Sequence, residues 1–276
     1  MLEKVVFITG ASSGMGETTA LRLKKAGYTV YAGARRVERM NNLQQQGIHT
    51  LRLDVTDDSS MTQAIEQIIK EQGRIDILIN NAGYGSYGAL EDVPISEAKY
   101  QFEVNVFGLA KLTQLVLPYM RKEKYGKIVN ISSIGGKIYE PLGAWYHATK
   151  FAVEGLSDCL RLEVKGFGID VIVIEPGGIK TEWSGIAGEN LLKTSGSTAY
   201  GQLARQMANM FRNSTSGSEP DVIAKIIEKS IQARKPKTRY AAGFGSKPFL
   251  FLRKILSDKA YDRLWMFILR STAKNN

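Results

Sequence analysis

The chain contains only one cysteine, two histidines and seven prolines among its 276 residues. A single cysteine, Cys159, excludes an intramolecular disulfide, and its apolar helical surroundings predict a small buried side chain. His49 and His147 lie far apart in the sequence, so cysteine and histidine do not form the clustered ligand set of a metal site. We therefore expect no bound metal.

Long hydrophobic runs are also absent. No stretch reaches the roughly 18 uninterrupted apolar residues of a membrane-spanning helix. The first residues, MLEKVVFITG, have neither the basic start nor the apolar core of a signal peptide. With 43% hydrophobic and 23% charged residues and no repeat, the composition is that of an ordinary globular protein. These features predict a cytoplasmic location.

Acidic residues are scarce in one region. Residues 231–276 contain eleven Lys and Arg against two Asp, a net charge of +9, whereas the whole chain carries +10. Residues 1–230 are therefore almost neutral, which is unlike a domain with a basic nucleic-acid-binding face. We expect no nucleic-acid partner, a main domain over residues 1–246, and a basic amphipathic extension, residues 247–276, packed on it.

Glycine is plentiful, and short apolar runs alternate with amphipathic segments. Strands are predicted at 5–10, 29–34, 49–55, 76–83, 127–133 and 170–177. Several are apolar throughout, which is typical of strands covered on both sheet faces. Strict alternation of strand and helix predicts an α/β fold with a doubly wound, Rossmann-like parallel sheet, in one domain with a helical C-terminal extension. Ligands of such sheets bind beyond the carboxyl ends of the strands.

The first predicted strand ends in TGASSGMG, residues 9–16. Its three glycines allow a sharp turn and a close backbone approach to a phosphate, and the next helix presents its N-terminus to the same group. The spacing is G-x-x-x-G-x-G rather than the commoner G-x-G-x-x-G. We predict a site for a dinucleotide pyrophosphate made by Gly10, Ser12, Ser13, Gly14, Met15 and Gly16.

The same turn contains a rival motif. Gly10 to Gly14 fits G-x-S-x-G, the nucleophile elbow of α/β-hydrolases, which also joins a strand to a helix. A hydrolase needs further strands and an oxyanion loop before the elbow, but only nine residues precede Gly10. Its catalytic histidine would have to be His147, inside a helical segment. The hydrolase interpretation is therefore disfavoured.

The second predicted strand is followed at once by Arg35 and Arg36, with no acidic residue before Glu38. An acid at this place pairs with the ribose 2′-hydroxyl of NAD, whereas an arginine accommodates the 2′-phosphate of NADP. We predict that Arg35 and Arg36 help to hold NADP(H), with NAD(H) disfavoured.

The segment AWYHATKFAVEGL, residues 144–156, contains the only Tyr-x-x-x-Lys of the sequence. At positions i and i+4, Tyr146 and Lys150 share one helix face. A neighbouring ammonium lowers the pKa of a tyrosine towards the working range of an acid catalyst. Ser133, at the end of the preceding strand, can donate a hydrogen bond to the same substrate oxygen. We predict that Tyr146 gives a proton to a carbonyl oxygen as hydride arrives from a nicotinamide.

Together these motifs resemble the short-chain dehydrogenases/reductases over about residues 4–182. The ordered set is T-G-x-x-x-G-x-G at 9–16, Asp54, N-N-A-G at 80–83, Asn105, Ser133, Tyr146 with Lys150, and P-G-x-x-x-T at 176–181. The run ARRVERM and the long C-terminal extension look most like the subgroup similar to 17β-hydroxysteroid dehydrogenases.

The resemblance implies roles for residues that the spacing alone does not assign. In the family, Asn105 holds a water in a proton relay with Lys150, which also binds the nicotinamide ribose. Asp54 and the N-A-G turn contact the adenosine half, and Ile179 and Thr181 contact the carboxamide. The implied cofactor contacts beyond the first turn and the arginines are Asp54, Val55, Asn81, Ala82, Gly83, Tyr146, Lys150, Pro176, Gly177, Ile179 and Thr181. The resemblance also implies a homodimer or homotetramer formed through helices such as 96–121 and 145–166.

Several side chains near these motifs have more than one interpretation. Trp145 and Trp183 are expected to flank the pocket, where they either touch substrate or pack in the core. His147 points about 100° away from Tyr146 on a helix and is expected to be structural. Residues 247–269 show apolar residues at helical spacing with Lys and Arg between them. We expect a helix that closes the domain, covers an apolar pocket or lies on a membrane surface.

We therefore expect an NADP(H)-dependent oxidoreductase that interconverts a lipophilic ketone or aldehyde with its alcohol. Two other classes stay open: a non-catalytic NADP(H)-sensing protein, and a peripheral, lipid-associated reductase whose tail contacts an anionic membrane. The intact set Asn105, Ser133, Tyr146 and Lys150 disfavours the sensor, because a sensor needs no proton donor. The substrate stays open, since its pocket walls come from the segment 183–215, whose conformation the sequence does not predict.

Overall fold

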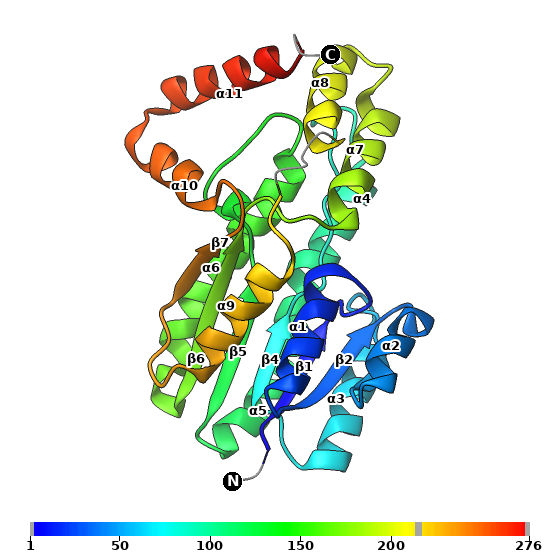
Figure 1. Cartoon of the computed structure of the whole chain (residues 1–276), viewed down its shortest axis with the longest axis vertical. Coiled ribbons are helices and arrows are strands. Elements are labelled where there is room, and N and C mark those ends of the chain that lie inside the picture. The colour runs from blue at the N-terminus through cyan, green and yellow to red at the C-terminus, as the bar shows by residue number, and fades with distance from the viewer. Residues whose placement is uncertain (1–2, 213–216, 274–276) are drawn as a thin grey trace.

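The structure is a computed structural model that describes residues 3–212 and 217–273. Its centre is a parallel sheet of seven strands in the order β3-β2-β1-β4-β5-β6-β7 (Figure 1). The strands are β1 (Val5–Thr9), β2 (Thr29–Ala34), β3 (His49–Arg52), β4 (Ile77–Asn80), β5 (Gly126–Ile131), β6 (Ile169–Pro176) and β7 (Arg239–Ala242). The strand order reverses between β1 and β4, where such sheets form their ligand crevice. The predicted doubly wound fold is confirmed.

Helices cover both faces of the sheet (Figure 1). The helices that pack on one face are α1 (Gly14–Lys25), α2 (Asn41–Gln45) and α9 (Asp221–Gln232), and those on the other are α3 (Asp58–Gln72), α5 (Gly108–Lys122) and α6 (Ala144–Val164). Within β1, Val6 and Ile8 point to the first face, while Val5 and Phe7 point to the second. Because successive side chains alternate between two covered faces, the strand is apolar throughout.

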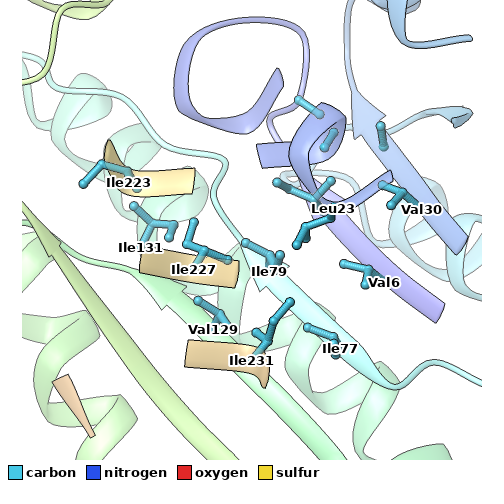
Figure 2. Close-up of a cluster of buried hydrophobic side chains, with 14 of the residues drawn as sticks. Val6, Leu23, Val30, Ile77, Ile79, Val129, Ile131, Ile223, Ile227 and Ile231 are labelled. Atoms are coloured by element: carbon cyan, nitrogen blue, oxygen red, sulfur yellow. The ribbon is translucent and has the colours of Figure 1, made fainter. Parts of the chain in front are cut away.

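Figure 2 shows the core on the first face, where sheet residues lie against α1 and α9. The labelled side chains are Val6, Leu23, Val30, Ile77, Ile79, Val129, Ile131, Ile223, Ile227 and Ile231, all of them buried. Branched aliphatic side chains from four strands thus fill the space under α1 and α9, although α9 begins at Asp221, far along the chain from the last of these strands, which ends at Ile131. This packing fixes the carboxyl ends of the central strands at one edge of the sheet.

The remaining helices gather beyond that edge or beside it (Figure 1). They are α4 (Ile95–Phe102), α7 (Glu182–Ser195), α8 (Gly201–Arg212), α10 (Ser246–Ile255) and α11 (Asp258–Ala273); the short 3₁₀ turns are η1 (Val37–Met40), η3 (Ile134–Gly136) and η4 (Lys165–Phe167). A π-helical turn, Glu103–Phe107, joins α4 to α5. We call α10 and α11, residues 246–273, the C-terminal arm. Within the described ranges, no helix combines the length and the apolar character needed to span a bilayer.

The predicted single helix over 247–269 is wrong. Leu256 is extended, with φ −85° and ψ 140°, and ends α10. Ser257 then starts α11, since its hydroxyl accepts a hydrogen bond from the Ala260 backbone N–H at 3.4 Å. Arg253 and Asp258 form an ion pair of 2.8 Å across the break. The segment is therefore a bent pair of helices; residues 274–276 of the predicted extension lie outside the described residues.

Other predictions also need correction. Most predicted strands run one to three residues too far, because their last residues leave the sheet to form the loops of the cleft. Strand β7 was not predicted, because its four residues are mostly half-buried and lack a strong apolar pattern. Cys159 is exposed rather than buried. It lies on the outer side of α6, while its neighbour Leu160 points into the core.

Candidate active site

Hydrogen bonds tie the carboxyl end of β1 to that of β4. The Thr9 hydroxyl oxygen accepts from the backbone N–H groups of Asn81 and Ala82, at 3.0 and 2.9 Å. The Asn81 side-chain Nδ2 donates to the carbonyls of Thr9 and Gly10, at 2.9 and 3.1 Å. Two loops that follow different strands are therefore held in one arrangement at the point where the strand order reverses.

The glycine turn leaves no room for side chains. Gly10 has φ +66°, and a Cβ atom there would lie 2.8 Å from Ala82 Cα. At Gly16, a Cβ would lie only 2.4 Å from the Gly10 carbonyl oxygen. Ser13, which precedes α1, makes no capping hydrogen bond with its side chain. The first N–H groups of α1 therefore keep their capacity to bind an anion, and the turn fits the pyrophosphate of a dinucleotide.

A cavity of about 520 Å³ extends from this turn along the ends of β2 and β3. The predicted cofactor residues that line it are Gly10, Ser12, Ser13, Gly14, Met15, Gly16, Arg35, Arg36, Asp54, Val55, Asn81, Ala82, Gly83 and Thr181. Arg35 and Arg36 are exposed, and Arg35 Nη1 donates to the Tyr100 hydroxyl at 2.8 Å. Asp54 Oδ1 accepts from the backbone N–H and the hydroxyl of Thr56, at 3.0 and 2.8 Å. The first cavity thus has a glycine-lined floor and two guanidinium groups at its rim.

A second cavity, of about 420 Å³, adjoins the first. The two share Met15, Asn81, Gly83, Tyr84, Thr181 and Trp183. The predicted residues that line the second are Ser133, Tyr146, Lys150, Pro176, Gly177 and Ile179, together with shared ones. The structure therefore brings the Ser, Tyr and Lys of the predicted catalytic set to one continuous cleft with the predicted cofactor residues.

The ionisation of Tyr146 differs from the prediction. Burial raises the pKa of Tyr146 to about 12, although a hydrogen bond with Ser133 lowers it in part. Burial also lowers the pKa of Lys150 to about 8. The Lys150 ammonium lies 6.0 Å from the Tyr146 ring centroid and donates to the Ile131 carbonyl at 3.0 Å. Desolvation sets the direction of the pKa shift of Tyr146, which is therefore held as a neutral hydroxyl.

Asn105 lies behind the cleft, in the π-helical turn, and lines neither cavity. Its Oδ1 accepts from the Tyr84 backbone N–H at 3.0 Å, and its Nδ2 donates to the Tyr84 carbonyl at 2.8 Å and the Thr149 hydroxyl at 3.0 Å. A Cβ on Gly83 would lie 3.1 Å from Asn105 Oδ1 and 3.8 Å from Lys150 Nζ. Asn105 therefore holds the loop after β4 against α6, and the water relay implied for it stays a prediction.

His147 is buried and makes structural hydrogen bonds. Its Nε2 accepts from the Glu140 backbone N–H at 3.2 Å, so its proton lies on Nδ1, which is 2.8 Å from the Gly135 carbonyl oxygen. This arrangement joins the start of α6 to the loop before it. It also removes the histidine that a hydrolase interpretation would require, because the ring has no free nitrogen for a nucleophile.

The walls of the second cavity come from more segments than the sequence indicated. The segment 183–215 contributes Trp183, Ser184, Met210 and Phe211, while its residues 213–215 lie outside the described residues. Loop residues that no sequence pattern indicated also line it, among them Tyr84, Tyr87, Glu140 and Phe244. Phe249, Trp265 and Ile268 come from the C-terminal arm, in agreement with the expectation that residues 247–269 cover an apolar pocket. Trp145 lines neither cavity and packs instead near Phe102, with ring centroids 6.5 Å apart.

Comparison with known proteins agrees with this site. A family model for short chain dehydrogenases matches residues 4–191. The chain is 39% identical over 243 residues to 3-ketodihydrosphingosine reductase of Bacteroides thetaiotaomicron, covering 88% of this chain and 89% of that protein. It is 33% identical over 270 residues to NADPH-dependent 3-dehydrocapnine reductase of Ornithobacterium rhinotracheale, covering 94% of each.

A solved structure with the same architecture is a short-chain dehydrogenase from Streptomyces avermitilis. It matches with a TM-score of 0.80 and 33% identity, and the match covers 99% of both chains. The hydroxysteroid-like subgroup is not singled out by these relatives. With the family model spanning well over half of the sequence, the chain belongs to the short-chain dehydrogenase/reductase family of oxidoreductases.

Proposed function

We propose that this protein is an NADP(H)-dependent reductase of a lipophilic ketone or aldehyde, or the corresponding alcohol dehydrogenase. One observation carries the proposal: Ser133, Tyr146 and Lys150 lie in an apolar cavity that adjoins a glycine-lined one. The names of the two bacterial relatives, both reductases and one described as NADPH-dependent, support the same class of reaction.

The residues of the first cavity fit an NADP cofactor. The close packing that Gly10 and Gly16 allow presents the first N–H groups of α1 to the cavity, where they would bind a pyrophosphate. Arg35 and Arg36 offer guanidinium groups to a 2′-phosphate. When bound, the nicotinamide supplies or accepts the hydride. Ile179 and Thr181, which line the second cavity beside the catalytic set, are proposed to orient that ring.

Tyr146 is proposed to hold the proton that the reduced carbonyl oxygen receives. Burial keeps its hydroxyl protonated at neutral pH, which suits the acid of a reduction. Ser133 would donate a hydrogen bond to the same oxygen, where negative charge develops in the transition state. Lys150, with a pKa lowered to about 8 by burial, is the nearby group that can return a proton at neutral pH.

The second cavity favours an apolar substrate. Its walls include seven Phe, Tyr and Trp side chains beside Tyr146: Tyr84, Tyr87, Trp183, Phe211, Phe244, Phe249 and Trp265. Each aliphatic or aromatic group that is buried against them contributes about 1.5–3 kcal/mol of binding free energy. A lipophilic carbonyl compound is therefore the proposed substrate.

We also propose a homodimer or homotetramer. Phe107, Phe151 and Leu162, on the segments 96–121 and 145–166, keep large exposed side chains, as expected of an interface between copies. Light scattering on the purified protein should give two or four times the monomer mass, and a monomer mass at micromolar concentration would contradict the assembly.

The C-terminal arm is proposed to contact an anionic membrane from the cytoplasm. Phe251 and Phe267 expose 62% and 69% of their surface, near Ile255 and Met266. Among the described residues, the arm cations without an ion pair are Lys247, Lys254, Lys259, Arg263 and Arg270. Apolar side chains among free cations are typical of helices that lie on anionic lipid. A second copy fits less well, because a two-fold contact places like charges together.

Replacing Tyr146 tests the catalytic assignment. Tyr146→Phe keeps the ring packing and removes the hydroxyl, so the fold should persist while kcat for a ten-carbon ketone falls by about 10²–10⁴. Stopped-flow or steady-state assays of NADPH absorbance measure the fall in kcat. Tyr125→Phe, at the opposite end of the sheet, is the matched control and should keep wild-type kcat. More than a tenth of wild-type kcat in Tyr146→Phe would refute the role.

Replacing Arg35 tests the cofactor preference. Arg35→Asp removes a phosphate partner and adds repulsion, so the Kd for NADPH should rise by about 10- to 150-fold. The Kd for NADH should change far less, and both are measured by fluorescence titration. Arg234→Asp, an exposed site outside both cavities, makes the same charge change and should leave both constants unaltered. Equal affinity of the wild type for the two cofactors would contradict the preference.

Vesicle flotation tests the membrane contact. The wild type should float with vesicles that contain phosphatidylserine, and it should remain in the bottom fraction when the vesicles contain phosphatidylcholine alone. The double variant Phe251→Asp, Phe267→Asp should lose at least about 10-fold in partitioning, because two apolar anchors become charged. Phe167→Asp, an exposed phenylalanine in η4, is the control. Flotation of the double variant at the wild-type level would show that the arm does not bind the bilayer.

A further inference from the structure

Glu140 places a carboxylate in the wall of the apolar second cavity. It lies in the loop between η3 and α6, and its side chain is only 14% exposed. Its Oε1 accepts a hydrogen bond from the Tyr87 hydroxyl at 2.8 Å. A buried carboxylate is expensive in an apolar environment unless a cation or several donors compensate it. One tyrosine hydroxyl does not supply that compensation.

Within residues 3–212 and 217–273, no cation neutralises this carboxylate. Among the residues that the structure describes, only His147 comes within 4.0 Å as an ion-pairing candidate. The imidazole is neutral there, because Nε2 accepts a hydrogen bond from the Glu140 backbone N–H and Nδ1 alone carries a hydrogen. The other cation of the cavity, Lys150, donates to the Ile131 carbonyl, and Glu154 is the acid that acts on its charge. The charge of Glu140 therefore faces the cavity without a cationic partner among the described residues.

That charge acts on the reacting group. Burial is the main reason that the pKa values of Tyr87 and Tyr146 are raised, and the negative charge of Glu140 raises both further. The carboxylate is thus close enough to Tyr146 to influence its ionisation. A substrate group that reached Glu140 would lie beside the carbonyl that Tyr146 serves.

Aromatic rings surround the same place. The Tyr87 ring centroid lies 5.5 Å from that of Tyr146, 5.9 Å from that of Trp183 and 5.1 Å from that of Phe211. Trp183 also lies 5.4 Å from Tyr146 and 6.1 Å from Phe211. The faces of aromatic rings attract cations, and groups of several rings bind organic ammonium ligands. A nearby carboxylate adds Coulomb attraction. The ring cluster and Glu140 together match an organic ammonium.

A purely structural role explains the carboxylate poorly. The loops of Tyr87 and Glu140 are already joined by the hydrogen bond from the Gly88 backbone N–H to the Leu142 carbonyl, at 2.8 Å. The His147 contact with the Glu140 backbone holds the loop from its other side. A neutral amide at position 140 would accept the hydrogen bond from the Tyr87 hydroxyl equally well, without the desolvation cost of a charge.

We propose that Glu140 is a specificity-determining residue that binds an ammonium group of the substrate. The substrate class is then a lipophilic amino ketone, or the amino alcohol in the reverse direction, with the ammonium held between Glu140 and the rings of Tyr87, Trp183 and Phe211. The reaction of this substrate rests on the proposed reductase function, but the binding of an ammonium does not.

Binding is tested first, without turnover. Decylammonium, decanol and decanoate are titrated below their micelle concentrations, and the fluorescence of Trp183 and Trp265, which line the cavity, reports binding. The wild type should bind decylammonium most tightly and decanoate least. In Glu140→Gln, which keeps an acceptor for Tyr87, the affinity for decylammonium should fall by about 10- to 150-fold. Glu66→Gln, an exposed glutamate on α3, removes the same charge elsewhere and should preserve the order.

Turnover then separates this proposal from the proposed function. The kcat/KM for 2-aminooctadecan-3-one should exceed that for octadecan-3-one, and the ratio should fall towards one in Glu140→Gln. Equal wild-type binding of decanol and decylammonium, or a full ammonium preference in Glu140→Gln, would overturn the role of Glu140. The wild-type comparison needs no variant, so it decides the matter even if Glu140→Gln does not fold. Ammonium binding with no reduction of either ketone would refute the reductase while supporting the site.

Discussion

The cleft depends on how tightly the carboxyl ends of β1 and β4 are held beside each other. Thr9 and Asn81 exchange hydrogen bonds across this junction, and the backbone of Gly10 comes so close to Ala82 that no side chain fits between them. The apolar faces of β1 and β4 bring the two strands together in the core. The hydrogen bonds between Thr9 and Asn81 then order the loops that follow these strands. Both cavities share residues of this junction, so their relative position follows from it.

Burial beyond the junction determines the chemistry of the reacting groups. Removing water disfavours the charged form of both an acid and a base. It therefore raises the pKa of Tyr146 and lowers that of Lys150, which moves the pair towards neutral hydroxyl and neutral amine. An i, i+4 pair on an exposed helix would behave in the opposite way, because the ammonium would dominate. The pKa values of Tyr146 and Lys150 thus depend on the helices beyond the sheet, because these helices exclude water from the two side chains.

The C-terminal arm, which covers part of the apolar cavity, has two sides with different properties. The inner sides of α10 and α11 contribute Phe249, Trp265 and Ile268 to the apolar cavity, while Phe251 and Phe267 point outwards among cations. Such an arm separates the cavity from water on one side and offers an apolar, basic surface on the other. Among the described residues that line the cavity, Glu140 is the one acid, and we propose that it distinguishes an ammonium-bearing substrate from a neutral hydrocarbon chain.

Much of the scaffold could be predicted from local sequence. Apolar strands, the glycine turn after Thr9 and the spacing of Tyr146 and Lys150 are short-range patterns with direct physical meaning, and the order of elements then placed them at one sheet edge. The tertiary structure alone decided the exposure of Cys159, the existence of β7, the bend at Leu256 and the direction of the Tyr146 pKa shift. It also decided the meeting of Glu140 with Tyr87, Trp183 and Phe211. These features depend on burial and on contacts between loops and helices that are distant in the chain. The residue pattern of one segment does not predict which other segment will pack on it.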